Sequence, residues 1–192
     1  MNRIRVAIIA ALLVPTAHAA EPLPDNEIEL AGYRGNPTLR AFFEYAVAEK
    51  VAVYLSATAA KKDFEEIAIG PAYYVTPEME IGLSVGVARY AAADREAESH
   101  RVVSMFGYLK NAQVEAEATV SRYGHDPEPW YYRVYVQAPF ADRWSAGLYG
   151  EQDIGWGPRI SWAFHRNASA WVAPILKKSG DSALVGGVRM SF

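Results

Sequence analysis

The stretch EIGLSVGVARY, residues 80–90, decides the fold, because its large apolar residues occupy every second position. Ile81, Leu83 and Val85 share one parity, while small or polar residues fill the positions between them. Successive side chains of a β-strand point to opposite faces, whereas a helix repeats every 3.6 residues. The stretch therefore predicts a strand with one apolar face and one polar face.

The same alternation recurs along the chain in segments of roughly the length that crosses a bilayer as a tilted strand. Turn-forming residues separate the segments, for example Asn111, Arg166-Asn167 and Ser179-Gly180-Asp181. We expect about ten strands, with eight or twelve as alternatives. The expected strands are 42–58, 64–75, 79–90, 101–110, 113–123, 130–138, 143–153, 158–165, 168–177 and 181–192.

The segment 42–58 is longer than the others and is read as one strand. Tyr45, Val47, Val51 and Val53 keep one parity through Glu49-Lys50. A two-residue turn there would make the residues on either side of it face the same way and break that parity. One long strand also gives the even total that single-chain bacterial barrels have.

The first residues have the layout of a cleaved secretory signal peptide. Arg3 and Arg5 precede an apolar run over 6–14, and Ala17-His18-Ala19 supplies the small residues of a cleavage site. We expect residues 1–19 to be the signal peptide, with the cut after Ala19. Residues 20–40, which are acidic and contain prolines, are expected to form a periplasmic N-terminal segment or plug, and residues 41–192 the folded domain.

The last strand is the most specific feature of the sequence. Leu184, Val188, Met190 and Phe192 alternate with smaller or polar residues up to the aromatic at the end. This pattern resembles the C-terminal strand of bacterial outer-membrane β-barrel proteins, without pointing to one family among them. The resemblance implies a Gram-negative outer-membrane location, contact with lipid and lipopolysaccharide, and recognition of these four residues by the barrel-assembly machinery.

Physical reasoning leads to the same class. In hydrocarbon every backbone N–H and C=O needs a partner, which only helices and closed barrels provide. Since the pattern excludes helices, we expect an all-β protein, an antiparallel up-and-down transmembrane β-barrel. A soluble periplasmic β-barrel binding protein is the alternative, because a soluble antiparallel sheet also alternates.

The polar parity of each strand gives the residues expected in the lumen. They form either a salt-bridged plug, because buried charges must be paired, or the lining of a narrow polar path. The residues are Glu44, Glu66, Glu80, Glu115, Glu117, Arg133, Glu151, Asp153, Arg159, His165 and Arg189.

Composition and motifs exclude several functions. The chain has no Cys and a net charge of −3, which argues against thiolate metal sites and against nucleic acid as a partner. His165 and Ser161 share a strand but lie four residues apart, ~13 Å, too far for a nucleophile and its base. We expect no metal, no cofactor and no enzymatic activity.

The predicted function is therefore a structural or accessory role, or a narrow passage, in the bacterial envelope. A larger envelope or polymer-export complex is a further expected partner. The main alternative is an outer-membrane hydrolase or acyltransferase that acts on lipid A or on peptides.

Overall fold

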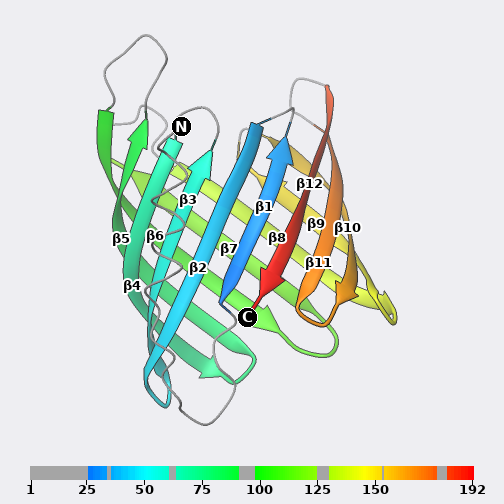
Figure 1. The fold of residues 1–192 in the computed structure, drawn as a ribbon, viewed down its shortest axis with the longest axis horizontal. Helices are drawn as coiled ribbons and strands as arrows, with labels where there is room; N and C mark the ends of the chain where they lie inside the picture. Colours follow the sequence, from blue (N-terminus) through cyan, green and yellow to red (C-terminus); the bar gives the residue numbers. More distant parts are fainter. Residues whose placement is uncertain are drawn as a thin grey trace.

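The computed structural model describes residues 26–33, 36–60, 64–90, 98–124, 130–152, 154–176 and 181–192. These residues form a closed antiparallel barrel of twelve strands, in which each strand pairs with its neighbours in sequence and β1 pairs with β12 (Figure 1). Within them, no helix is long and apolar enough to cross a membrane. The strands are β1 (Glu27–Tyr33), β2 (Asn36–Ala48), β3 (Val51–Ala60), β4 (Phe64–Thr76), β5 (Met79–Tyr90), β6 (Glu98–Lys110), β7 (Glu115–Tyr123), β8 (Trp130–Ala141), β9 (Trp144–Glu151), β10 (Gly155–His165), β11 (Ala168–Leu176) and β12 (Ser182–Ser191).

The barrel closes through β1, which pairs along its whole length with β2 on one side and β12 on the other. Leu30, for example, lies opposite Leu39 of β2 and Val188 of β12. A closed sheet has no unpaired edge, so the backbone groups of these strands bond to one another. This closure makes the barrel compatible with a hydrocarbon environment.

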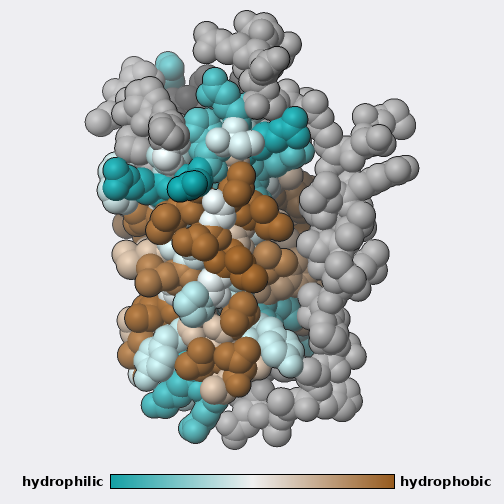
Figure 2. Space-filling model, turned by 90° about the vertical axis from the view of Figure 1, so that its left-hand side faces the viewer, coloured by the Kyte–Doolittle hydropathy of each residue, from teal (hydrophilic) through white to brown (hydrophobic). Residues whose placement is uncertain are grey.

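The alternation of β5 sorts its side chains as the sequence predicts, with the apolar face outside. Leu83 and Val85 are 56% and 62% exposed, whereas Glu80 and Ser84 are 7% and 3% exposed. Figure 2 shows the result as a band of apolar side chains between two polar rims. An exposed apolar surface of this extent is a liability in water and is the character of a lipid-facing wall.

The two ends of the barrel differ in the lengths of their connections. At the turn end, where Phe192 lies, the connections are the short ones at 49–50, 77–78, 111–114, 142–143 and 166–167. At the loop end, the connections are 34–35, 61–63, 91–97, 124–129, 152–154 and 177–181, so the longest ones lie at this end. Short turns at one end and longer loops at the other are the asymmetry expected of an outer-membrane barrel.

The prediction of one long strand over 42–58 is wrong, because β2 and β3 form a hairpin around Glu49-Lys50. Ala46 pairs with Ala52 and Ala48 with Val51, so β2 contains one residue more than β3 at this point. This β-bulge shifts the register by one residue. The bulge restores the parity that a plain two-residue turn would have broken, which is why the apolar pattern continues through the turn.

The prediction for residues 20–40 is corrected from Glu27 onward, because β1 and the first part of β2 belong to the barrel wall. In β1, Ile28 and Leu30 alternate with Glu27 and Glu29, so the segment carried the strand pattern. The acidic and proline-rich composition before it hid a strand only seven residues long. The expected signal peptide lies outside the described residues.

Candidate functional site

The lumen divides into two halves of unlike content. We call β1 and β8–β12 the packed half, because aromatic and charged side chains fill the interior there. We call β2–β7 the hollow half, because a cavity lies against it. Glu115 and Glu117 of β7 and Arg40 of β2 lie at the boundary and belong to the charged network.

Arg159 is the centre of the packed half. Its guanidinium lies between two rings, 4.2 Å from the centroid of Tyr135 and 4.3 Å from that of Trp171. Its Nε donates to the Ser161 hydroxyl at 3.2 Å, and the side chain is 2% exposed. Stacking on aromatic faces stabilises a buried guanidinium, so this arginine holds strands β8, β10 and β11 together.

Glu29 of β1 collects donors from three other strands. Its carboxylate accepts from Arg133 at 2.8 Å, from Arg40 at 3.1 Å and from the Trp171 indole at 2.9 Å. Arg133 also donates to Glu117. The side chain of Glu29 is 1% exposed, so its charge depends on these donors rather than on water.

Arg189 of β12 makes the second part of the network. Its Nη1 donates to Glu115 at 2.9 Å and to the Tyr135 hydroxyl at 2.6 Å, and the same hydroxyl donates to Glu115 at 2.9 Å. Its Nε lies 3.0 Å from Glu27. The strands on both sides of the closure are thus joined through the interior as well as through the backbone.

Glu151 connects the network to the boundary with the hollow half. It accepts from Arg40 at 3.1 Å, from the Tyr131 hydroxyl at 2.5 Å and from Tyr149. Arg40 therefore bridges Glu29 and Glu151, which come from β1 and β9. Arg40 uses one Nη for each carboxylate, and such charge-assisted hydrogen bonds are stronger than neutral ones.

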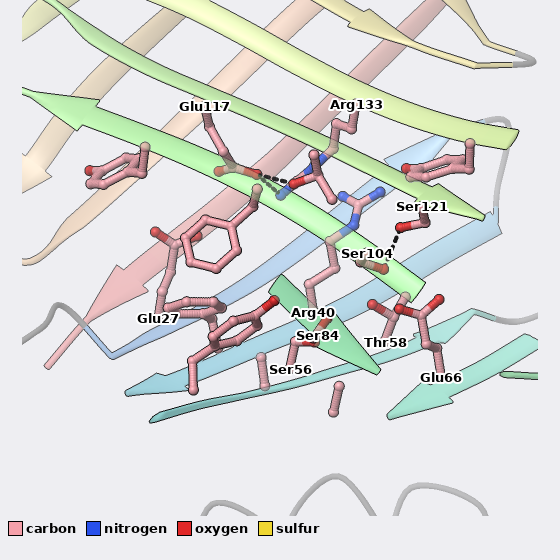
Figure 3. Close-up of a pocket in the computed structure, with 18 of the residues that line it drawn as sticks. Glu27, Arg40, Ser56, Thr58, Glu66, Ser84, Ser104, Glu117, Ser121 and Arg133 are labelled. Atoms are coloured by element: carbon pink, nitrogen blue, oxygen red, sulfur yellow. Dashed lines mark hydrogen bonds and ion pairs between the residues drawn. The ribbon is translucent and has the colours of Figure 1, made fainter. Parts of the chain in front are cut away.

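A cavity of about 940 Å³ occupies the hollow half. Its lining includes Met79 and Lys110 at the turn end and Ala60 and Tyr90 at the loop end, so it follows the length of the barrel. Figure 3 shows Ser56, Ser84 and the boundary pair Glu117–Arg133 around it. Serines, threonines and alanines line much of this wall, together with aromatic side chains such as Phe42, Tyr54 and Phe106.

One aromatic cluster narrows the cavity without closing it. The Phe106 ring lies 5.5 Å from that of Phe42 and 4.6 Å from that of Tyr54. The ring lies against the wall because residue 82 is glycine: a Cβ there would be 2.1 Å from Phe106 Cε1. Gly82 therefore keeps the cluster at the wall and leaves the rest of the section open.

The carboxylates of the hollow half are bound differently from those of the network. Glu44 accepts from the Tyr74 hydroxyl at 2.8 Å, and Glu66 accepts from the Tyr123 hydroxyl at 2.6 Å. Glu80 is buried, and its Oε1 has no hydrogen-bond partner in the part of the chain that the structure describes. Among the ion pairs between described residues, none involves these three acids.

The structure divides the residues that the sequence assigned to the lumen into three groups. Those that meet in the charged network are Glu115, Glu117, Arg133, Glu151, Arg159 and Arg189. Those that face the cavity instead are Glu44, Glu66 and Glu80. His165 is exposed at the turn end, so its assignment to the lumen is wrong: a register shift between Ala163 and His165 ends the regular alternation. Asp153 lies outside the described residues.

Three residues of the network were missed by the sequence analysis, namely Glu27, Glu29 and Arg40. All three fall in the segment that composition assigned to an N-terminal plug. Their alternation with Ile28, Leu30 and Leu39 was the signal that could have found them. The four residues of the expected assembly signal, Leu184, Val188, Met190 and Phe192, are exposed on the outer face.

The described histidines lack the surroundings of a catalytic base. His100 Nδ1 lies 2.7 Å from the Gly124 carbonyl and its Nε2 lies 3.6 Å from Glu98. His165 Nδ1 accepts from the backbone of Asn167 at 3.3 Å. A nucleophile needs a base within hydrogen-bond reach, and neither histidine is hydrogen-bonded to a serine in the described part of the chain. Nor do the described residues include a group of three or more ligands that could hold a metal ion.

Solved structures with this fold include a KdgM porin and the outer membrane phospholipase A of Escherichia coli. The KdgM porin is similar with a TM-score of 0.52 and 10% sequence identity, over 88% of this chain and 99% of that chain. The phospholipase is similar with a TM-score of 0.59 and 9% identity, over 95% of this chain and 96% of that chain. The resemblance to bacterial outer-membrane β-barrels is thus confirmed as a likeness of fold, with no specific family.

Comparison by sequence adds no relative. No protein-family model matches the chain, and no curated protein matches it. The function therefore has to be argued from the geometry of the lumen.

Proposed function

We propose that this protein is a small channel of the bacterial outer membrane, in which the hollow half lets small polar solutes pass. The observation that carries the proposal is the cavity of about 940 Å³, whose lining residues come from both ends of the strands. A barrel of eight strands is just filled by its side chains. Twelve strands with small residues on one side leave room for a path.

The packed half supports this function rather than opposing it. A salt-bridged plug and a polar path were alternatives for the whole lumen, but they occupy different halves of this barrel. Arg40 and Arg133, fixed by acids of other strands, form the wall that faces the cavity. A rigid wall keeps a narrow path open, because its side chains have no freedom to collapse into it.

The outer surface supports insertion in a membrane over the alternative of a soluble periplasmic binding protein. Exposed apolar side chains cover the outer face of β5, and Trp144 and Trp162 stack near the turn end with ring centroids 6.0 Å apart. Aromatic rings favour the level where acyl chains meet headgroups. We propose the outer membrane as the location and its lipids and lipopolysaccharide as the surrounding molecules.

The assembly of the barrel follows from the same proposal. Phe192 and Met190 are exposed on the outer face of the final strand, where another protein can reach them. We propose that the barrel-assembly machinery recognises this strand. Deleting Phe192 should lower the amount of assembled barrel in the membrane, and unchanged assembly would contradict this role.

We propose that the protein has no enzymatic activity. The likeness to the phospholipase concerns the fold, and hydrolysis would need a nucleophile with a base beside it. A direct assay of the purified barrel on phospholipid and lipid A, with His100→Ala and His165→Ala as matched variants, tests this point. Hydrolysis that is lost in one variant and kept in the other would favour the enzyme instead.

The channel is tested by inserting the purified protein into planar bilayers. We expect discrete conductance steps, with migration on gels that changes on heating as the check that the barrel is folded. Deletion of Phe192 serves as a control for assembly. A folded barrel that inserts and gives no conductance would contradict the proposal.

A further inference from the structure

We infer that the channel selects small cations, including organic ammonium ions, and that Glu44, Glu66 and Glu80 confer this selectivity. The inference rests on the proposed passage through the hollow half. It goes further by stating the chemistry of the solute.

The charges around the cavity are mostly negative. Among the described residues that line it, the bases are Arg40, Lys110 and Arg133. The acids that line it are Glu27, Glu44, Glu66, Glu78, Glu80, Glu117 and Glu151. An excess of one sign in a low-dielectric channel raises the concentration of the opposite ion inside it.

The arginines of the lining are already neutralised by acids, so they attract anions weakly. Arg40 lies 3.1 Å from both Glu29 and Glu151, and Arg133 lies 2.8 Å from Glu29 and also pairs with Glu117. Glu44 and Glu66 differ from the acids of the network in their hydrogen-bond donors. Their donors are tyrosine hydroxyls, which carry no positive charge. The field in the path is therefore set by carboxylates.

Glu80 leaves an acceptor open toward the path. Its side chain is buried, it lines the cavity, and its Oε1 has no hydrogen-bond partner among the described residues. A buried carboxylate oxygen without a donor is costly, so it needs a cation or a donor supplied from the path. A hydrated metal ion or an ammonium group provides both the charge and the hydrogen bond.

The three carboxylates lie at three positions along the strands, which suits conduction. Glu44 pairs with Tyr54, which pairs with Gly70; Glu66 lies four residues before Gly70 in β4, and Glu80 pairs with Tyr74, four residues after it. Each separation of four residues is ~13 Å at 3.3 Å per residue. Several moderately binding sites in series let an ion enter and also leave.

The aromatic cluster lies between Glu66 and Glu80 along the strands, and it favours organic cations. Tyr54 and Phe42 line the cavity together with Phe106. Their faces attract an ammonium group, whose alkyl body the rings also accommodate. Anions gain nothing from these faces. They also meet three acids that form no ion pair among the described residues.

The test is the reversal potential of the reconstituted channel in a KCl gradient, repeated with tetramethylammonium chloride. We expect potassium to be at least ~3-fold more permeant than chloride, and tetramethylammonium to be conducted as well. The variant Glu44→Gln/Glu66→Gln/Glu80→Gln should lose this preference. Glu49→Gln, an exposed acid in the β2–β3 turn, is the matched control and should keep it.

A second variant tests the inference even if the triple variant does not fold. Ser56→Lys places a positive charge on the hollow wall, next to Phe42 and Ala68 in the sheet, and should reduce or reverse the preference. Conductance without cation preference, or a preference that survives both changes, would overturn this inference and leave the channel in place. An absence of any conductance would overturn the channel and the inference together.

Discussion

The packed half and the hollow half present the same outer face and opposite interiors. Both have apolar residues facing out, as Val85 in β5 and Val136 in β8 show. Inside, the residues of β5 are Glu80, Gly82, Ser84, Gly86 and Ala88, whereas those of β8 are Tyr131, Arg133, Tyr135 and Gln137. The membrane requires apolar residues on the outer face of every strand. The inward residues can be large and fill the lumen, or small and leave space in it.

The division also separates the two kinds of carboxylate. Acids of the packed half are partners of arginine and contribute to stability, because removing one leaves a buried charge unmatched. Acids of the hollow half are bound by tyrosine hydroxyls or have an oxygen without a partner. The same residue type therefore holds the barrel together on one side and faces the passing solute on the other.

The largest effect on stability is expected when the network loses its central acid. Glu29→Ala leaves Arg133, Arg40 and the Trp171 indole without a shared acceptor and should lower the free energy of unfolding by about 3–5 kcal/mol. Glu66→Ala in the hollow half loses one tyrosine bond and should cost about 1 kcal/mol. Unfolding by denaturant in detergent, followed by heat-dependent gel migration, measures both, and equal losses would break the distinction between the halves.

A smaller effect is expected from removing single hydroxyls. Tyr135→Phe keeps the ring under Arg159 but loses the bonds to Glu115 and Arg189, and should cost about 1–3 kcal/mol. Tyr123→Phe frees Glu66 beside a cavity that admits water, so its cost should be below about 1 kcal/mol. The same unfolding measurement applies, and a larger loss for Tyr123→Phe would show that the hollow half is the more tightly bonded one.

Filling the cavity should change conduction more than stability. Ser56→Phe adds a ring where the lumen has space, and should change the free energy of unfolding by less than about 1 kcal/mol. The single-channel conductance should fall several-fold, because the path narrows. Ala173→Phe is the counterpart in the packed half, where the fully buried alanine leaves no room, and it should destabilise the barrel instead. Unchanged conductance in Ser56→Phe would place the path elsewhere.

The smallest effect on stability is expected from salt. Raising KCl from about 0.1 M to about 1 M shortens the screening length from about 10 Å to about 3 Å. The cation preference of the hollow half should fall, because its carboxylates face the solution in the path. The midpoint of unfolding should barely move, since the ion pairs of the packed half are buried. Reversal potentials and unfolding curves in the same two salts compare the halves directly.

Much of the barrel could be predicted from local pattern. The strands from β4 to β12 agree with the expected segments to within a few residues, because period-two alternation is a property of each strand by itself. The strand count was too low for two local reasons, a bulge near Ala46 that masked a turn and the short strand at Glu27–Tyr33. Both features lie in the first part of the chain. For the strand at Glu27–Tyr33, the acidic and proline-containing composition was given more weight than the alternation of apolar and polar residues.

The sequence by itself determined that the strands are amphipathic and which parity of each faces outward, because neighbouring residues of one strand settle that. Only the tertiary structure decided which inward residues meet. Glu29 reaches Arg133 across 104 residues and Trp171 across 142, and such partners follow from closure and register rather than from spacing. For the same reason, the presence of a filled half and an open half appears only when all twelve described strands are arranged around one lumen.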